Sequence, residues 1–238
     1  MKIVHLKKID STQEYLKNFF KEFKDEELFI FADTQTKGKG RFENKFFSPE
    51  GGIYLSFYLP DLKEQRRAFL ITSVSAFTFI EDVTKKYNLR PYIRIPNDIM
   101  IENKKICGIL IEKINDNFIN GVGINVNTED FPEELKSAGS LYLFTGEKFN
   151  LNNLKMELIS RILEFNKKNS EFLYEIYRKN IPLNVKIEFV HENRSYRGIL
   201  KNIMDNFYIE VLREKNIKYF SLFEIFNFRI IDEKENLF

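Results

Sequence analysis

Apolar residues recur along this chain at two different spacings, and each spacing predicts one kind of element. Short apolar and aromatic runs predict strands, whereas apolar residues three and four positions apart predict amphipathic helices. The runs of strand type before residue 183 are 1–9, 28–32, 53–59, 92–95, 98–101, 106–113 and 118–126. The predicted helices run from a capping box at 11–14 to about 23, and over 62–87, 150–169 and 171–179. This mixture predicts an α+β domain in which helices pack on one mixed β-sheet.

From Leu183 onward the pattern changes to short strands separated by polar turns. These predicted strands cover 185–190, 195–203, 206–212 and 217–222. Short strands in close succession are typical of a small β-barrel, here of the size of an SH3 domain. Pro182 ends the preceding helix, so we expect a larger domain at 1–181 and an SH3-like C-terminal domain at 182–238.

The composition is that of an ordinary folded protein. Of 238 residues, 43% are hydrophobic and 15% aromatic, which is enough for a sizeable core. The 37 Lys and Arg residues nearly balance 35 Asp and Glu residues, and a formal net charge of +2 gives no general reason to bind nucleic acid or an anionic membrane. We therefore expect neither as a partner.

Cysteine usage and hydropathy favour a cytoplasmic protein. Cys107 is the single cysteine, so no internal disulfide can form, and the sequence has no Cys and His cluster with metal-ligand spacing. The N-terminus lacks the continuous apolar run of a signal peptide. The most apolar stretch, 68–80, contains four Ser and Thr residues and is too short to span a bilayer, so it predicts a buried helix.

The loop between the second and third predicted strands, residues 34–52, is long for a compact domain, and such loops often bind ligands. Its glycines let the backbone approach a ligand closely, while Lys37, Lys39 and Arg41 offer positive charge that suits a phosphate. The loop lacks the Gly-Lys-Ser/Thr ending of a P-loop and does not lead directly into a helix. A solvated charged loop without a ligand is the alternative that these residues alone leave open.

Further motifs surround this loop in a fixed order. The chain reads DSTQ at 10–13, QTKGKGR at 35–41, SPEG at 48–51, RIPND at 94–98, KICGILIE at 105–112 and GVGINVN at 121–127. In order and spacing these resemble the motifs of the biotin protein ligases, D-S-T-N, Q-T-A-G-R-G-R, S-P-x-G, K-W-P-N-D, K-x-x-G-I-L-x-E and G-x-G-x-N. The resemblance covers about residues 9–141, with a weaker match through the terminal barrel.

The resemblance implies a fold, a reaction and a partner. The fold would be the mixed sheet of the class II synthetases and biotin ligases, followed by the SH3-like barrel. The enzyme would use ATP and Mg²⁺ to activate biotin as biotinyl-5′-AMP, and would transfer biotin to a specific lysine of a biotin carboxyl carrier domain. Because the biotin carboxylate is ionised at neutral pH, it can attack the α-phosphorus itself, and no catalytic triad is needed.

The resemblance also assigns residues of this sequence to the site. The matched biotin-binding residues are Ser11, Thr12, Gln35, Gly38, Arg41, Lys105, Gly108 and Gly123. The matched ATP-binding residues are Lys39, Gly40, Arg41, Asn97, Lys105 and Asn125. The matched catalytic residues are Lys105, Arg41 and Asp98, and Asp98 is also the candidate Mg²⁺ ligand.

Each implied role has a chemical reason. The polar side chains early in the site would hydrogen-bond the ureido head of biotin, and the strand glycines would admit its ring. Lys39 and Arg41 would bind phosphate oxygens, and Lys105 would contact the carboxylate and α-phosphate where negative charge accumulates. Asn125 would contact the adenine, and Asp98 is a hypothetical base for the carrier lysine.

Structural readings of the same residues stay open beside these roles. They are a helix cap for Ser11, a hairpin-turn lysine for Lys105, turn formation for Asn97, Asp98 and Asn125, and a small core residue for Cys107.

The sequence departs from the family pattern at several positions. Gln13 stands for Asn, Lys37 for Ala, Lys39 for Arg, Glu43 and Asn44 for Gly-Arg, Phe46 for Trp, and Arg94 and Ile95 for Lys-Trp. With no Trp in the chain, a stacking surface for the adenine must come from Phe, Tyr or aliphatic residues. We expect the activity class to hold and the 37–47 loop to be partly mobile without biotin.

Two other functions remain as alternatives. One is a lipoate or octanoate transferase of the same superfamily, which would lack the Gly-Lys-Gly-Arg loop and the barrel. The other is a sensor that binds biotin adenylate without transferring it. Because the sequence starts at the first predicted strand, we expect no operator binding, whereas a monomer and a homodimer are both compatible with it. The ligase hypothesis requires Arg41 and Lys105 to face one shared cavity.

Overall fold

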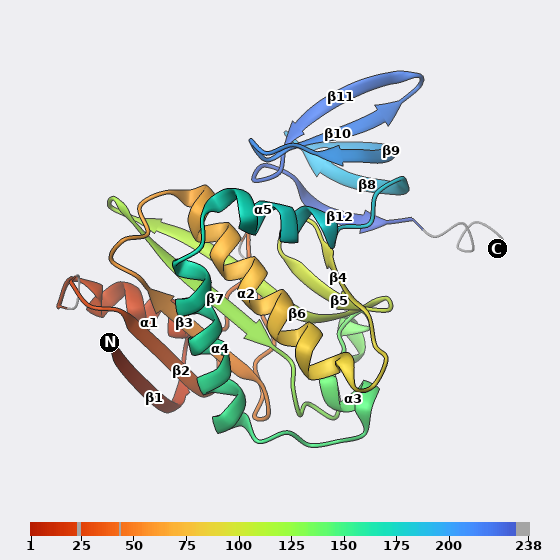
Figure 1. The fold of residues 1–238 in the computed structure, drawn as a ribbon. Coiled ribbons are helices and arrows are strands. Elements are labelled where there is room, and N and C mark those ends of the chain that lie inside the picture. The colour runs from red at the N-terminus through yellow and green to blue at the C-terminus, as the bar shows by residue number, and fades with distance from the viewer. Residues whose placement is uncertain (23–24, 43, 232–238) are drawn as a thin grey trace.

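A seven-stranded mixed sheet forms the larger part of the molecule (Figure 1). The computed structural model describes residues 1–22, 25–42 and 44–231. The strands of this sheet are β1 Lys2–Ile9, β2 Leu28–Gln35, β3 Ile53–Tyr58, β4 Pro91–Arg94, β5 Asp98–Ile101, β6 Lys104–Ile114 and β7 Asn117–Ile124. Their order is β1-β2-β3-β7-β6-β5-β4, with β1 and β2 parallel and the other neighbours antiparallel. The predicted mixed sheet is confirmed.

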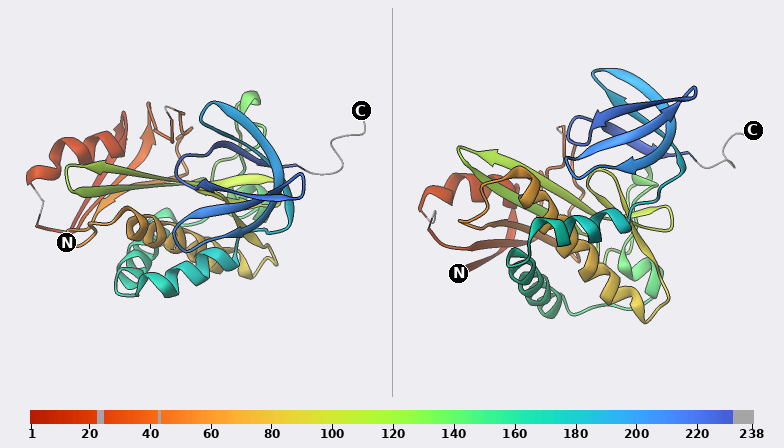
Figure 2. Two further views of the ribbon diagram at one scale, coloured as in Figure 1. Left: turned by 90° about the horizontal axis from the view of Figure 1, so that it is seen from above. Right: turned by 45° about the horizontal axis from the view of Figure 1, so that its top comes forward.

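Helices cover the two faces of this sheet unequally. The α-helices are α1 Thr12–Phe19, α2 Gln65–Lys85, α3 Leu141–Thr145, α4 Leu151–Asn166 and α5 Ser170–Lys179, and the 3₁₀ turns are η1 Phe20–Glu22 and η2 Glu133–Leu135. Figure 2 shows α2, α4 and α5 on one face and α1 on the other. The helix expected to reach Phe23 ends as an α-helix at Phe19, and Phe23 itself lies outside the described residues.

The alternation of side chains along the strands creates two cores. Phe29 and Phe31 of β2 face the large core under α2, whereas Leu28 and Ile30 face a small core under α1 with Leu16. The stretch 68–80 lies inside α2 and is almost wholly buried, as its pattern predicts. In the part of the chain that the structure describes, no helix has both the length and the apolar character of a membrane span.

A second, antiparallel sheet follows α5, as expected for an SH3-like domain. Its strands are β8 Val185–His191, β9 Arg194–Ile203, β10 Tyr208–Arg213, β11 Asn216–Ser221 and β12 Phe226–Ile230, in the order β11-β10-β9-β8-β12. The pattern did not predict β12. The domain bounds 1–181 and 182–238 remain a prediction, and residues 232–238 lie outside the described chain.

Aromatic side chains join the second sheet to the first domain. Phe69 of α2 meets the rings of Phe207 and Phe223 edge-on, each at 5.4 Å between centroids. Tyr177 of α5 packs against the same Phe69 ring at 5.2 Å. This continuous packing places residues 226–228 beside residues 39–42 and 44–46 of the loop between β2 and β3.

Candidate active site

A cavity of about 270 Å³ lies on the sheet face that carries α1. It is lined by the turn before α1, the 39–46 loop, the turn between β4 and β5, and residues of β3, β6 and β7. The predicted site residues that line it are Ser11, Thr12, Gln35, Lys39, Gly40, Arg41, Asn97, Asp98, Lys105, Gly108 and Gly123. Arg41 and Lys105 therefore face one shared cavity.

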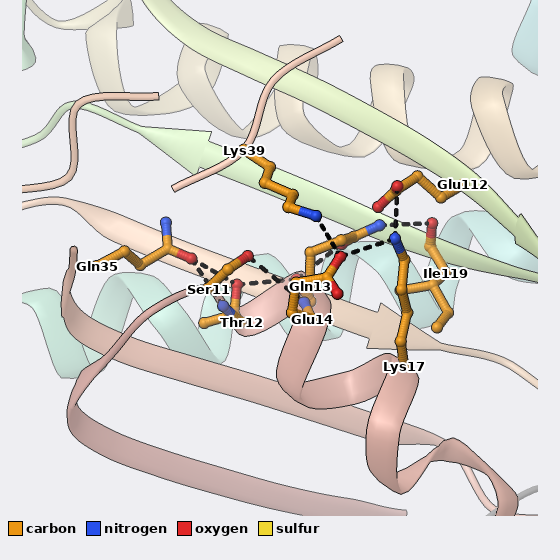
Figure 3. A network of polar contacts seen from close by, with 10 residues as sticks. Ser11, Thr12, Gln13, Glu14, Lys17, Gln35, Lys39, Glu112 and Ile119 are labelled. Carbon is orange, nitrogen blue, oxygen red and sulfur yellow. Dashed lines mark hydrogen bonds and ion pairs between the residues drawn. The ribbon is translucent and has the colours of Figure 1, made fainter. Parts of the chain in front are cut away.

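One end of the cavity consists of neutral polar side chains. The backbone N–H and the hydroxyl of Thr12 both donate to Gln35 Oε1, at 2.8 and 3.0 Å (Figure 3). Ser11 is the N-cap of α1, where its hydroxyl oxygen accepts the N–H of Glu14 at 3.5 Å. Ser11 thus combines the predicted helix cap with a position on the cavity wall, because a capping oxygen still keeps its own proton.

The middle of the cavity floor is occupied by an aromatic ring. A Cβ atom built on Gly123 would lie 2.6 Å from Phe46 Cε1, and one on Gly108 would lie 2.9 Å from Phe46 Cε2. The two strand glycines thus permit the close approach that their positions predicted, but in this structure the group that approaches is Phe46. This ring stands where the family pattern has Trp.

Two cations flank one half-buried carboxylate at the other end. Arg94 Nη2 donates to Asp98 Oδ2 at 2.7 Å, and Lys105 Nζ lies 2.6 Å from Asp98 Oδ1 as an ion pair. Burial alone would raise the pKa of Asp98, but the charges of Lys105 and Arg94 outweigh it and hold that pKa below its ordinary value. Asp98 is therefore ionised and paired in this structure, and its role as a base stays a hypothesis.

These contacts also bear on the expected Mg²⁺ site. Asp98 is the only carboxylate among the described residues that line the cavity, and both its oxygens are paired with cations. No group of three or more His, Cys, Asp and Glu side chains gathers anywhere in the described chain. A Mg²⁺ ion held by protein side chains alone therefore does not fit this arrangement, and Asp98 as a metal ligand remains a prediction.

Two cations of the loop between β2 and β3, Arg41 and Lys39, bind neighbouring parts of the molecule. Arg41 Nη2 donates to the backbone oxygens of Phe223 and Ile225, at 2.8 and 3.3 Å, which connects the loop to the turn between β11 and β12. Burial lowers the pKa of Arg41, but an arginine remains charged at neutral pH. Lys39, expected to bind phosphate, instead pairs with Glu14 Oε1 of α1 at 2.6 Å (Figure 3).

Two predicted contact residues do not line the cavity. Asn125 is 4% exposed, and its amide Nδ2 donates to the backbone oxygens of Gly139 and Lys105, at 2.9 and 3.4 Å. Its side chain therefore supports the backbone of Lys105 from behind. Gly38 is required by the loop itself, since a Cβ there would lie 2.4 Å from the backbone oxygen of Phe46.

A comparison with known protein families decides the family of the chain. The model of the Biotin/lipoate A/B protein ligase family matches residues 6–129, which is more than half of the sequence. This chain belongs to that family.

Individual members of the Biotin/lipoate A/B protein ligase family agree with this assignment. The bifunctional ligase/repressor BirA of Bacillus spizizenii is 37% identical over 152 residues, 60% of this chain and 46% of the relative. BirA of Escherichia coli is 30% identical over 161 residues, 65% of this chain and 50% of the relative. The chain thus spans about half the length of the curated relatives it matches.

The fold resembles that of a solved member of the same family along its whole length. A biotin protein ligase from Aquifex aeolicus, in complex with biotin and ATP, matches with a TM-score of 0.85 and 29% identity. The match covers 97% of this chain and 99% of that one.

Sequence reasoning missed three polar members of this family site. Gln13 and Ser56 line the neutral end of the cavity and are 3% and 1% exposed, and Arg94 lines the charged end. Ser56 had a detectable signal, because it is the one hydroxyl residue without an aromatic ring in an otherwise apolar strand, β3, that is buried throughout. Arg94 was visible only as a departure from the family pattern, and Cys107 is the buried core thiol that we expected.

Proposed function

We propose that this chain is a biotin protein ligase, which forms biotinyl-5′-AMP from biotin and ATP and transfers biotin to a lysine of a biotin carboxyl carrier domain. The observation that carries the proposal is the shared cavity, in which Arg41 and Lys105 face the same space as the neutral end at Thr12 and Gln35. A site that joins two anions needs such cations, and a cyclic urea needs such neutral polar groups. Family membership and the Aquifex structure with biotin and ATP support the same activity.

The first step needs positioning and charge neutralisation rather than a protein base. A carboxylate oxygen of biotin attacks the α-phosphorus, and the bond from that phosphorus to the bridging oxygen of the β-phosphate breaks, which releases pyrophosphate. Lys105, already at the charged end, turns from Asp98 toward the new acyl-phosphate, while Arg94 continues to neutralise the carboxylate of Asp98. Lys105 thereby meets the charge that develops in the transition state.

The second step transfers the acyl group. The neutral amine of the carrier lysine attacks the acyl carbon, the bond to the AMP oxygen breaks so that AMP leaves, and the proton lost from the nitrogen passes to water. We propose that Asp98 holds Lys105 in place before the first step and stays paired with Arg94 throughout. We further propose that Mg²⁺ enters with the nucleotide phosphates, since Asp98 is the one carboxylate among the described residues that line the cavity.

A labelling experiment tests the activity and separates it from the alternatives. The protein is incubated with radiolabelled biotin, ATP, Mg²⁺ and a biotin carboxyl carrier domain, and parallel tubes contain labelled octanoate or lipoate with a lipoyl domain. We expect label on the biotin carrier only. Label on the lipoyl domain would indicate the transferase, and biotinyl-AMP without label on the carrier would indicate the sensor.

Ligand binding should also stabilise the fold. Saturation of a single site at about 100 times its dissociation constant adds roughly 2.7 kcal/mol to the free energy of unfolding. We therefore expect biotin plus ATP to raise the melting temperature in differential scanning fluorimetry, and biotin plus AMP to raise it less. An unchanged melting temperature with biotin plus ATP would contradict the proposed site.

A further inference from the structure

The neutral end of the cavity is built as a chain of hydrogen bonds, buried except at the half-buried Gln35. We call this chain the head network and define it as the side chains of Thr12, Gln13, Gln35 and Ser56. All four side chains line the cavity. Gln13 stands where the family pattern has Asn, and its Oε1 would lie 2.9 Å from a Cβ built on Gly121, so this glycine gives the side chain its space.

The orientation of the Gln13 amide is fixed by the sheet. Its Nε2 donates to the backbone oxygen of Ile119 in β7 at 3.2 Å (Figure 3). A carbonyl oxygen can only accept, so the nitrogen must face Ile119 and the oxygen must face Ser56. The hydroxyl of Ser56 then donates its single proton to Gln13 Oε1 at 2.9 Å.

The same accounting leaves one acceptor site of the network open, although no oxygen lacks a partner, since Gln35 Oε1 also accepts the backbone N–H of Thr12 at 2.8 Å. Thr12 Oγ1 lies 2.9 Å from Ser56 Oγ and 3.0 Å from Gln35 Oε1, and both of these oxygens are acceptors toward it. Thr12 carries one hydroxyl proton, so it can satisfy only one of the two at a time. The remaining acceptor is available to an N–H group that enters the cavity.

The orientation of Gln35 is fixed in the same way from the other side. Its Nε2 donates to Ser48 Oγ at 2.9 Å, and Ser48 in turn donates to the backbone oxygen of Phe46. Gln35 Oε1 therefore faces Thr12. Ser11, whose oxygen accepts a backbone N–H, keeps its own proton for a ligand carbonyl.

We infer that Gln13 and Ser56 are positioning residues that set the direction of the hydroxyl protons, so that the head network presents acceptors to the N–H groups of a cyclic urea. The inference rests on the proposed function, because it takes biotin as the ligand. It adds a basis for selectivity: a dithiolane ring or an alkyl chain has no N–H to donate and would leave this acceptor site of the network without a ligand hydrogen bond.

The test uses two ligands, biotin and an analogue methylated at one ureido nitrogen. The binding of both ligands is measured for the wild-type protein and for Gln13→Met. Loss of one hydrogen bond lowers affinity by about tenfold. We expect Gln13→Met to raise the KM for biotin by about tenfold, with kcat and the KM for ATP within about twofold of wild type, in an assay of pyrophosphate release. The wild-type protein should bind biotin more tightly than the methylated analogue, and Gln13→Met should narrow that difference in calorimetry.

Two further variants serve as checks. Ser56→Ala removes the proton that Gln13 accepts and should raise the KM for biotin in the same way, while Gln65→Met, an exposed position at the start of α2, should leave it unchanged. An unchanged KM for biotin in both Gln13→Met and Ser56→Ala, or equal wild-type affinity for biotin and its methylated analogue, would overturn the inference. Biotinylation of the carrier by the wild-type protein separates the two failures. If the wild-type protein biotinylates the carrier, only the inference about Gln13 and Ser56 fails; if it does not, the proposed function fails.

Discussion

Lys105→Met is expected to slow the formation of biotinyl-AMP by about 10²- to 10³-fold, the usual effect of removing one preorganised group that stabilises developing charge. Methionine keeps the length of the side chain but carries no charge to meet the acyl-phosphate. The fold should tolerate the change, because Asp98 keeps its hydrogen bond to Arg94 and is not left as an unpaired buried charge. The rate is measured as pyrophosphate release at saturating biotin and ATP.

The neighbouring lysine provides the matched control. Lys104 is exposed in the same hairpin, and its ammonium group donates to the backbone oxygen of Lys136, away from the cavity. Lys104→Met should keep the rate within about twofold of wild type, as expected for a surface substitution. Equal rates for Lys105→Met and wild type would show that this cavity is not where the anions are joined.

Local sequence patterns predicted those helices and strands that have a capping or hydrophobic pattern of their own. Ser11 and Glu14 mark the start of α1, and the apolar run 68–80 marks the interior of α2. The strand β12 escaped prediction, because Phe226–Ile230 follows another aromatic segment without a clear turn signal and gains its pairing from β8, far away in the sequence. Strand order has the same origin, since β3 pairs with β7 through contacts that no local pattern encodes.

The site was predictable to the extent that motifs bring residues together. The ligase motifs predicted that Arg41 and Lys105 face one cavity, and both side chains line it. The partners of the loop cations were not predictable, because Lys39 meets Glu14 from α1 and Arg41 meets backbone oxygens of the turn between β11 and β12. Such contacts depend on tertiary packing. Because of them, Lys39 is held in an ion pair with Glu14 in this structure and must leave that pair to bind a phosphate.

Phe69→Ala is expected to have the largest effect on stability, because Phe69 packs among the aromatic rings at the junction between the first domain and the C-terminal sheet. Phe69 is 3% exposed and meets three aromatic rings edge-on. Replacement of a buried Phe by Ala costs about 3–5 kcal/mol, from lost apolar burial and from the cavity that remains. The measurement is urea unfolding followed by circular dichroism, with the free energy of unfolding extrapolated to water.

Phe172→Ala is the control for this change, since Phe172 is 43% exposed on α5 and should cost less than about 1 kcal/mol. The junction also links stability to the site: Phe223, which packs on Phe69, supplies a backbone oxygen that Arg41 binds at 2.8 Å. A loosened junction should therefore release Arg41 and raise the KM for ATP at temperatures where Phe69→Ala is still folded. A loss of stability below about 1 kcal/mol would mean that the rings repack without Phe69 and that the C-terminal sheet is held by other contacts.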